Sequence, residues 1–182
     1  FIPTDEGVAA LAALRDQGVR VRVLTNSVQA TDVVVVHAGY AKYRKPLLRH
    51  GVELFELRQS APAEGQGGGR QQASHSPLGS SGSSLHAKTM AVDGQRVFVG
   101  SFNFDPRSAA LNTEMGIVVD RPVLAEQIQP AFATQIPAMA YRVDTDEQGQ
   151  LRWHSGVGEP PPIYTSEPDM GLLRRLLVGL VA

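Results

Sequence analysis

Four polar side chains that suit a phosphate group fall within eighteen residues of this chain: His86, Lys88, Ser101 and Asn103. Lysine supplies positive charge, serine and asparagine donate hydrogen bonds, and an imidazole can attack phosphorus or transfer a proton. Residues i and i+2 of a β-strand lie on the same face, so His86 and Lys88 are expected to project together. This set of side chains predicts chemistry at a phosphate ester.

A β-hairpin is expected to position these side chains. Asp93-Gly94 is a strong signal for a two-residue turn. A loop at Asp93-Gly94 would pair His86 with Ser101, and a loop at Gly94-Gln95 would pair His86 with Asn103. Either register places all four polar side chains on one face. Gly100, just before the serine, allows close approach of another backbone.

The pattern H-x-K-x4-D, followed by G-S-x-N, resembles the signature of the phospholipase D superfamily. Here it comprises His86, Lys88, Asp93 and residues 100–103. The resemblance implies a phosphohistidine intermediate, formed without a metal or other cofactor, and catalytic roles for His86, Lys88, Asp93 and Glu114. Glu114 would be the carboxylate that orients His86, while Lys88, Ser101 and Asn103 would bind the substrate phosphate.

The resemblance extends to bacterial cardiolipin synthases, and is closest to the type that lacks amino-terminal membrane helices. It covers nearly the whole chain except roughly residues 60–82. The segments that carry it are residues 1–4, 21–26, 30–32, 37–44, 84–89 and 99–108. The superfamily also contains nucleases, lipases and toxins, so the lipid reaction is an expectation that rests on these further segments.

Members of this kind carry two such motifs, one in each half, and this chain contains one. We therefore expect it to be a carboxy-terminal fragment that supplies the second catalytic motif; the alternative is a trimmed form of a complete single-motif protein. In family terms, a histidine of the first half attacks the phospholipid phosphorus, and His86 acts as general acid and base. An imidazole ordinarily titrates close to neutral pH, which suits that role.

The implied function is phosphatidyl transfer in cardiolipin synthesis, with phosphatidylglycerol or a similar phospholipid as substrate. The implied partners are the missing amino-terminal half and a membrane surface, at the cytoplasmic face of the bacterial inner membrane, as a peripheral protein. Transfer to a glycerol hydroxyl and hydrolysis by water differ only in the acceptor, so a phospholipase D-type hydrolase stays open. Two further alternatives are a nuclease phosphodiesterase working as a homodimer and an inactive lipid-binding half.

The composition of the chain narrows the set of possible functions. The chain has 182 residues, a formal net charge of −1 and no cysteine, so it forms neither disulfides nor thiolate metal sites. Near-neutral charge argues against a nucleic acid partner, although a local basic groove would suffice for one. The five histidines show no common zinc spacing, so no metal site is expected. There is no apolar run of eighteen residues to span a membrane.

Alternating helix and strand patterns predict an α/β class: a phospholipase D-like α/β sandwich, one of two pseudo-repeat halves, with a mixed sheet flanked by helices. We divide the chain into a catalytic half-domain at residues 1–158, with a mobile Gly/Ser/Gln-rich loop at 59–84, and a linker and amphipathic helix at 159–182. Helices are expected from Thr4, over 31–49 with Pro46 perturbing its end, and from Pro122. Strands are expected over 19–23, 52–57, 113–119, 141–143 and 151–154.

Some candidate residues also have simpler interpretations. Asp93 lies at the turn, opposite in parity to His86, and is more typical of a residue that fixes hairpin geometry than of one that contacts substrate. Ser101 and Asn103 also suit turn chemistry, and Glu114 also suits an ordinary charge at the start of a strand. A lone strand histidine is usually structural, but His86 is accompanied by the rest of the signature.

Two further segments are candidates for lipid contact. His37 and Tyr40 share a helix face and are predicted as headgroup contacts, with core packing as the alternative. Lys42, Lys45 and Arg49 form a basic stripe that suits either anionic lipid or a solvated helix face. Leucines recur at helical spacing over residues 172–180, which predicts an amphipathic helix that lies on the membrane or docks on the domain's own core.

Overall fold

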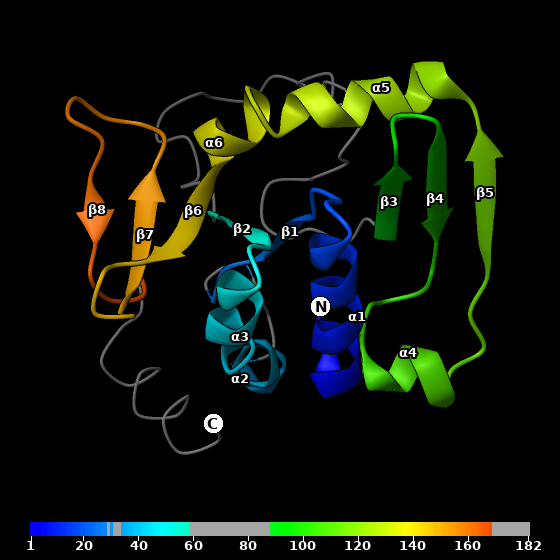
Figure 1. Cartoon of the computed structure of the whole chain (residues 1–182), viewed down its shortest axis with the longest axis horizontal. Helices are drawn as coiled ribbons and strands as arrows, with labels where there is room; N and C mark the ends of the chain where they lie inside the picture. Colours follow the sequence, from blue (N-terminus) through cyan, green and yellow to red (C-terminus); the bar gives the residue numbers. More distant parts are fainter. Residues whose placement is uncertain (29, 31–33, 59–87, 169–182) are drawn as a thin grey trace, which may run out of the picture.

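The computed structural model of this chain describes residues 1–28, 30, 34–58 and 88–168. Within them the fold has two β-sheets, one of five strands and one of three, together with six helices (Figure 1). Three sequence expectations lie outside the described residues: the loop at 59–84, the placement of His86 and the helix at 172–180. No helix of the described part is long and apolar enough to cross a membrane.

The larger sheet confirms the mixed α/β class. Its strand order is β1-β2-β6-β7-β8. Strands β1 (Arg22–Asn26) and β2 (Glu53–Leu57) are parallel, and every other pairing in this sheet is antiparallel. A parallel pair needs a crossover connection, which here contains the helices α2 (Val34–Ala41) and α3 (Arg44–Arg49).

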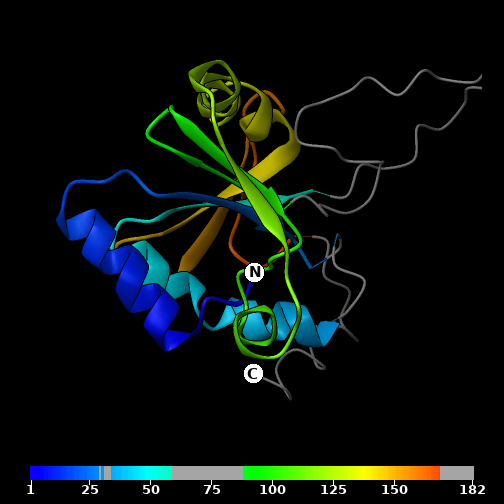
Figure 2. The same ribbon diagram turned by 90° about the vertical axis from the view of Figure 1, so that its right-hand side faces the viewer.

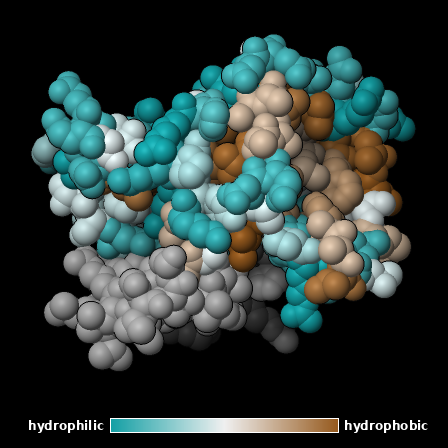
Figure 3. Space-filling model, turned by 60° about the horizontal axis from the view of Figure 1, so that its bottom comes forward, coloured by the Kyte–Doolittle hydropathy of each residue, from teal (hydrophilic) through white to brown (hydrophobic). Residues whose placement is uncertain are grey.

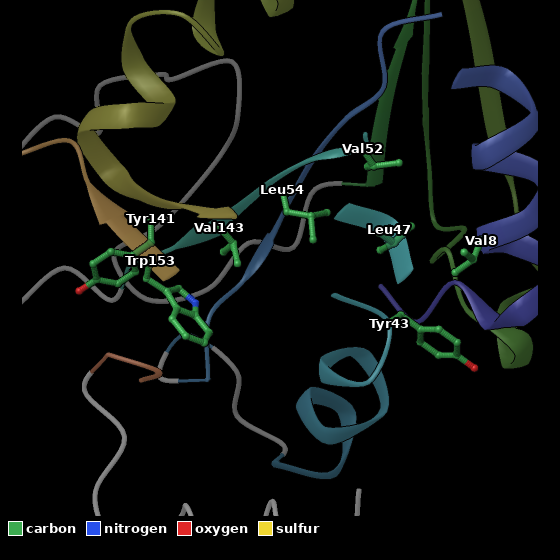
Figure 4. Packing of buried hydrophobic residues seen from close by; sticks show 8 residues of the cluster. All are labelled: Val8, Tyr43, Leu47, Val52, Leu54, Tyr141, Val143 and Trp153. Carbon is green, nitrogen blue, oxygen red and sulfur yellow. The ribbon is translucent and has the colours of Figure 1, made fainter. Parts of the chain in front are cut away.

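The main hydrophobic core lies between this sheet and its helices (Figure 4). Helix α1 (Thr4–Asp16) contributes Val8, and α3 contributes Leu47. Strands β2, β6 (Ala140–Thr145) and β7 (Leu151–Ser155) contribute the opposite side, including Leu54 and Trp153. Helix α1 begins at Thr4, as expected, and the Thr4 hydroxyl accepts a hydrogen bond from the amide of Gly7 at 3.3 Å.

The smaller sheet contains part of the signature segment and has the order β3-β4-β5. Its strands are β3 (Lys88–Val92), β4 (Arg96–Gly100) and β5 (Gly116–Asp120), all antiparallel. Helix α5 (Pro122–Ala131) crosses the end with the β3–β4 turn, and α4 (Pro106–Ala110) lies near the other end (Figure 1). The sheet therefore has a turn end beside α5 and an open end toward α4.

The smaller sheet exposes large apolar side chains on both faces. Met90 and Val118 lie on one face, and Val99 and Ile117 lie on the other; Val118 is 66% exposed and Ile117 is 63% exposed. Figure 3 shows hydrophobic surface gathered on this side of the molecule. Contiguous exposed apolar surface of this kind is typical of an interaction face.

The expected helix over 31–49 differs from the structure, in which α2 ends at Ala41 and α3 begins at Arg44. Pro46 lies in the first turn of α3 and does not perturb its end. The reason is that amide groups of a first turn have no intrahelical acceptor, so proline loses nothing there. The predicted strand over 113–119 begins later, at Gly116.

The chain keeps contact with the larger sheet beyond the predicted domain boundary at residue 158. Strand β8 (Ile163–Tyr164) pairs with β7, and the Ser155 amide donates to the Pro162 carbonyl at 3.0 Å. Glu167 reaches the buried side of α3, where its carboxylate binds Arg44 at 2.5 Å. Residues 159–168, which belong to the segment predicted as a linker and amphipathic helix, thus pair and pack in this structure, and the division at residue 158 stays a prediction.

Candidate functional site

The described signature residues gather at the open end of the smaller sheet, except Asp93. Lys88 is the first residue of β3 and lies directly opposite Gly100, the last residue of β4. Ser101 follows at once, and its amide donates to the Met115 carbonyl at 2.8 Å. Glu114 lies two residues before β5 begins. The ladder therefore brings residues far apart in sequence to one end of the sheet.

Ser101 and Glu114 form the centre of this cluster. The Ser101 hydroxyl donates to Glu114 Oε2 at 2.5 Å and accepts from the Met115 amide at 3.0 Å. The other carboxylate oxygen, Oε1, accepts from the Asn112 side-chain amide at 3.2 Å. Glu114 is thus held on both oxygens, which fixes the direction of its carboxylate.

These donors shift the ionisation of Glu114. The hydrogen bond from Ser101 is the main cause that lowers the pKa of Glu114 below its ordinary value, and hydrogen bonds from Ser108 and Asn112 act in the same direction. The charge of Lys88 also lowers this pKa, so Lys88 acts on the same carboxylate. At neutral pH the cluster therefore contains an ionised carboxylate beside a lysine.

The loop between β4 and α4 holds Asn103 by short-range hydrogen bonds. The Asn103 amide donates to the Ser108 hydroxyl at 3.3 Å, and the Asp105 amide donates to the Asn103 carbonyl at 2.8 Å. Asp105 is also the N-cap of α4: its Oδ1 accepts from the Ser108 amide at 2.8 Å, and Pro106 follows it. The loop is therefore tied to the start of a helix.

The register of the β3–β4 hairpin differs from both expected registers. Asp93 and Gly94 form the turn, with φ of 52° and 66°, and the Gln95 amide donates to the Val92 carbonyl at 3.0 Å. The ladder, however, pairs Val92 with Arg96, which leaves three residues between the paired positions. Both predicted two-residue registers are wrong, because an extra residue shifts the ladder by one.

The correction changes which side chains face one another. Lys88 shares its face with Gly100, not with Ser101. Ser101 joins the cluster because the chain leaves the strand after Gly100. Asp93 lies five residues from Lys88 at the turn end, roughly 16 Å away at the usual rise of a strand. The structure thus separates Asp93 from the cluster, and its positive φ agrees with a role in hairpin geometry.

Gly100 and Gly116 permit a close approach of two strands, as expected for Gly100. The two residues pair directly, and the Phe98 ring lies over them. A Cβ on Gly116 would be 2.2 Å from that ring, and a Cβ on Gly100 would be 2.6 Å from the Met115 carbonyl oxygen. Larger residues at either position would push apart the strands that bring Ser101 to Glu114.

His37 and Tyr40, the candidate headgroup contacts, are both only 2% exposed. Tyr40 donates its hydroxyl proton to Glu56 Oε1 at 3.1 Å, and the His37 Nε2 atom contacts Glu167. Headgroup contact by these two residues stays a prediction. In this structure both belong to a buried polar network, whose other members are Arg44, Glu56, Trp153 and Glu167.

Sequence reasoning missed this network. Arg44 Nε donates to Glu56 Oε1 at 2.7 Å, and Trp153 donates its indole N–H to Glu56 Oε2 at 3.0 Å. Burial lowers the pKa of Arg44, but the charges of Glu56 and Glu167 outweigh it and raise that pKa. Burial raises the pKa of Glu167, but hydrogen bonding by His37 and the charge of Arg44 lower it overall. A glutamate between leucine and phenylalanine neighbours in β2 was the available signal.

Replacing Ser101 by alanine is expected to raise the pKa of Glu114 toward the ordinary glutamate value, because the Ser101 hydroxyl is the main donor that lowers it. The pKa is read by NMR titration of a selectively labelled glutamate. Asn112→Ala is the matched control, and its effect should have the same sign and be smaller. An unchanged Glu114 pKa in Ser101→Ala would contradict the geometry described here.

Comparison with known proteins extends these observations. The sequence model of the family described as "Cardiolipin synthase, PLD-like domain" matches residues 1–136. Cardiolipin synthase C of Escherichia coli is 43% identical over the whole chain, which spans 37% of that protein. Cardiolipin synthase A of Yersinia pseudotuberculosis is 27% identical over 66% of the chain and 20% of its own length.

A solved structure supports the fold independently. The phospholipase D family member Nuc from Salmonella typhimurium matches with a TM-score of 0.50 and 19% identity, over 78% of this chain and 75% of that one.

An uncharacterized protein of Helicobacter pylori is 31% identical over 85% of the chain and 26% of its own length. The chain thus spans about a third or less of the curated relatives it matches. The signature, the fold and the family match agree: this chain belongs to the phospholipase D-like domain family of the cardiolipin synthases.

Proposed function

We propose that this chain supplies one catalytic motif of a phosphatidyltransferase that acts on phospholipid phosphodiesters, as in cardiolipin synthesis. The observation that carries the proposal is the Ser101–Glu114 contact at 2.5 Å, held at the same end of the sheet as Lys88. Relatives named as cardiolipin synthases support the lipid substrate. Phosphatidylglycerol or a similar phospholipid is the proposed donor.

The proposed chemistry has two steps. A histidine of the other motif attacks the phosphorus and forms a phosphohistidine, while His86 gives a proton to the departing headgroup alcohol. His86 then takes the proton from the incoming glycerol hydroxyl, which attacks the phosphohistidine and releases the first histidine. Lys88 and Asn103 donate hydrogen bonds to the phosphate oxygens, where charge grows in the transition state.

Ser101 has a double role in this proposal. A serine hydroxyl has one proton to donate, and here that proton goes to Glu114. Phosphate binding by Ser101 therefore requires its hydroxyl to turn from Glu114 to a phosphate oxygen. Glu114, ionised and held by Asn112, is then the carboxylate that orients His86. Asp93 acts at a distance, by shaping the hairpin turn.

The proposed partners follow from the same reasoning. The second motif comes from another half of the full-length protein, which would cover the exposed apolar faces of β3, β4 and β5. Because the proposed substrate is insoluble in water, the proposed site of action is a membrane surface, and the proposed location is that of a peripheral protein at the cytoplasmic face of the inner membrane. The alternative is a homodimer of single-motif chains acting as a nuclease, against which the near-neutral net charge of −1 argues.

Product analysis of the full-length protein in phosphatidylglycerol vesicles tests the proposal. Transfer yields cardiolipin and free glycerol in equal amounts, whereas hydrolysis yields phosphatidic acid and glycerol. Cleavage of DNA without lipid turnover would favour the nuclease alternative. The isolated 182-residue chain, with one histidine motif, is expected to be inactive as a monomer.

Transfer is also expected to be independent of metal ions. The five histidines lack a common zinc spacing and the chain has no cysteine, so the lysine and the hydrogen-bond donors stabilise the phosphate in this proposal. Turnover is measured after dialysis against EDTA, with and without added magnesium, calcium or zinc. Activity lost in EDTA and restored only by a divalent ion would contradict this expectation.

A further inference from the structure

The buried polar network is connected to the signature loop by a path, that is, a series of side chains in direct contact. The loop is defined here as residues 101–105. At the other end of the path, Tyr40 is 2% exposed and bonded to Glu56, which is fully buried and paired with Arg44. The ring of Tyr40 is therefore fixed by a buried ion pair from two different elements, α3 and β2.

The first residues of the chain connect the two ends. The Phe1 ring packs edge-on against the Tyr40 ring, with centroids 5.8 Å apart, and lies 5.5 Å from the ring of Phe104. The Ile2 amide donates to the Phe104 carbonyl at 2.7 Å. Figure 2 shows the start of the chain close to α4 and α2.

Helix α2 also packs closely on this connecting segment. A Cβ on Gly39 would be 3.0 Å from Ile2 Cδ1, so α2 and Ile2 leave little free space between them. Phe104 is similarly enclosed, because a Cβ on Gly7 of α1 would be 3.1 Å from its ring. Displacement of Tyr40 would therefore shift Phe104, which lies in the signature loop between Asn103 and Asp105.

We propose that Tyr40 is a positioning residue for the phosphate site: its ring, fixed by the Arg44–Glu56 ion pair, holds Phe1, and Phe1 holds Phe104 and the signature loop. This inference rests on the proposed function for its effect on catalysis. The path is a chain of direct contacts between described residues, and it assigns a role to a network that lies apart from the signature.

The test measures loop order and catalysis separately, in the full-length protein. Amide hydrogen exchange over residues 101–111 reports loop order, because the amides of Ser101, Asn103, Asp105 and Ser108 are all hydrogen bonded. Tyr40→Leu is expected to speed exchange of this peptide and lower kcat, each by roughly tenfold, with little change in KM. Tyr40→Phe keeps the ring contact with Phe1 but loses the hydrogen bond to Glu56, so its effect on both measurements should have the same sign as that of Tyr40→Leu and be smaller.

Tyr141→Leu is the matched control. Tyr141 is a tyrosine of similar burial, 6% exposed, on β6, where its ring packs edge-on against that of Tyr164. Its loss should lower stability and leave the exchange of residues 101–111 and kcat unchanged. If Tyr40→Leu does not fold, Phe104→Leu removes the other end of the same path and is expected to give the same pair of effects.

The outcomes separate this inference from the proposed function. Absence of phospholipid turnover in the wild type would contradict the proposed function. Hydrogen exchange would still test whether Tyr40 holds the signature loop in place. Wild-type exchange in Tyr40→Leu, or the same rise in Tyr141→Leu, would overturn the inference even if transfer is confirmed. Faster exchange in Tyr40→Leu with unchanged kcat would overturn the effect on catalysis.

Discussion

Replacing His86 by alanine in the full-length protein is expected to lower phosphatidyl transfer by roughly 10²- to 10⁴-fold, the usual contribution of a general acid or base. The expectation rests on the position of His86 in the signature, two residues before Lys88. The measurement is the initial rate of cardiolipin formation in phosphatidylglycerol vesicles, with folding checked by circular dichroism and the thermal midpoint.

His154→Ala is the matched control for this substitution. His154 lies on β7 of the larger sheet, where its Nε2 is 2.9 Å from Asp144 Oδ1, and it belongs to no part of the signature. Its replacement should leave turnover unchanged. Near-wild-type turnover by a folded His86→Ala protein would remove His86 from the mechanism.

Replacing Arg44 by methionine is expected to reduce the free energy of unfolding by about 3–5 kcal/mol, because it leaves buried carboxylates without their cation. Arg44 is 3% exposed and binds both Glu56 and Glu167. The free energy of unfolding is measured by urea denaturation of the full-length protein and followed by the fluorescence of Trp153, the single tryptophan of this chain. Any tryptophan elsewhere in the full-length protein is replaced beforehand, so that the signal comes from Trp153 alone.

Arg20→Met is the matched control for Arg44→Met. Arg20 forms a salt bridge of similar length, 2.6 Å to Glu53, but its side chain is 65% exposed. Water solvates the remaining Glu53 carboxylate, so this loss should change stability little. Equal effects of the two substitutions would show that burial of the Arg44 network is not the source of its stability.

Much of the fold could be predicted from the sequence because its cues are local. The helix start at Thr4, the Pro122 helix start and the hairpin around Gly149 all arise from the conformational preferences of nearby residues, and the structure contains each of them. The break between α2 and α3 was not predicted, because the apolar pattern continues across it. The division into two sheets depends on pairings between distant strands, which no single segment encodes.

The candidate site divides in the same way. The signature identified Lys88 and Ser101, and the family resemblance implied Glu114; the structure brings all three to one end of the sheet. The hairpin register was predicted wrongly, because a turn signal at Asp93-Gly94 does not reveal a bulge beside it. The polar network was missed since its members are spread from residue 37 to residue 167, and only the fold brings them together.

The stereochemistry at phosphorus tests the central claim of two-step transfer most directly. The substrate is a phosphatidylglycerol made chiral at phosphorus with sulfur and oxygen isotopes, and the product formed by the full-length protein is analysed by ³¹P NMR. Two successive displacements, onto a histidine and then onto the acceptor, each invert the phosphorus, so the account predicts net retention of configuration. Inversion would show a single direct displacement and would contradict the phosphohistidine mechanism proposed for this site.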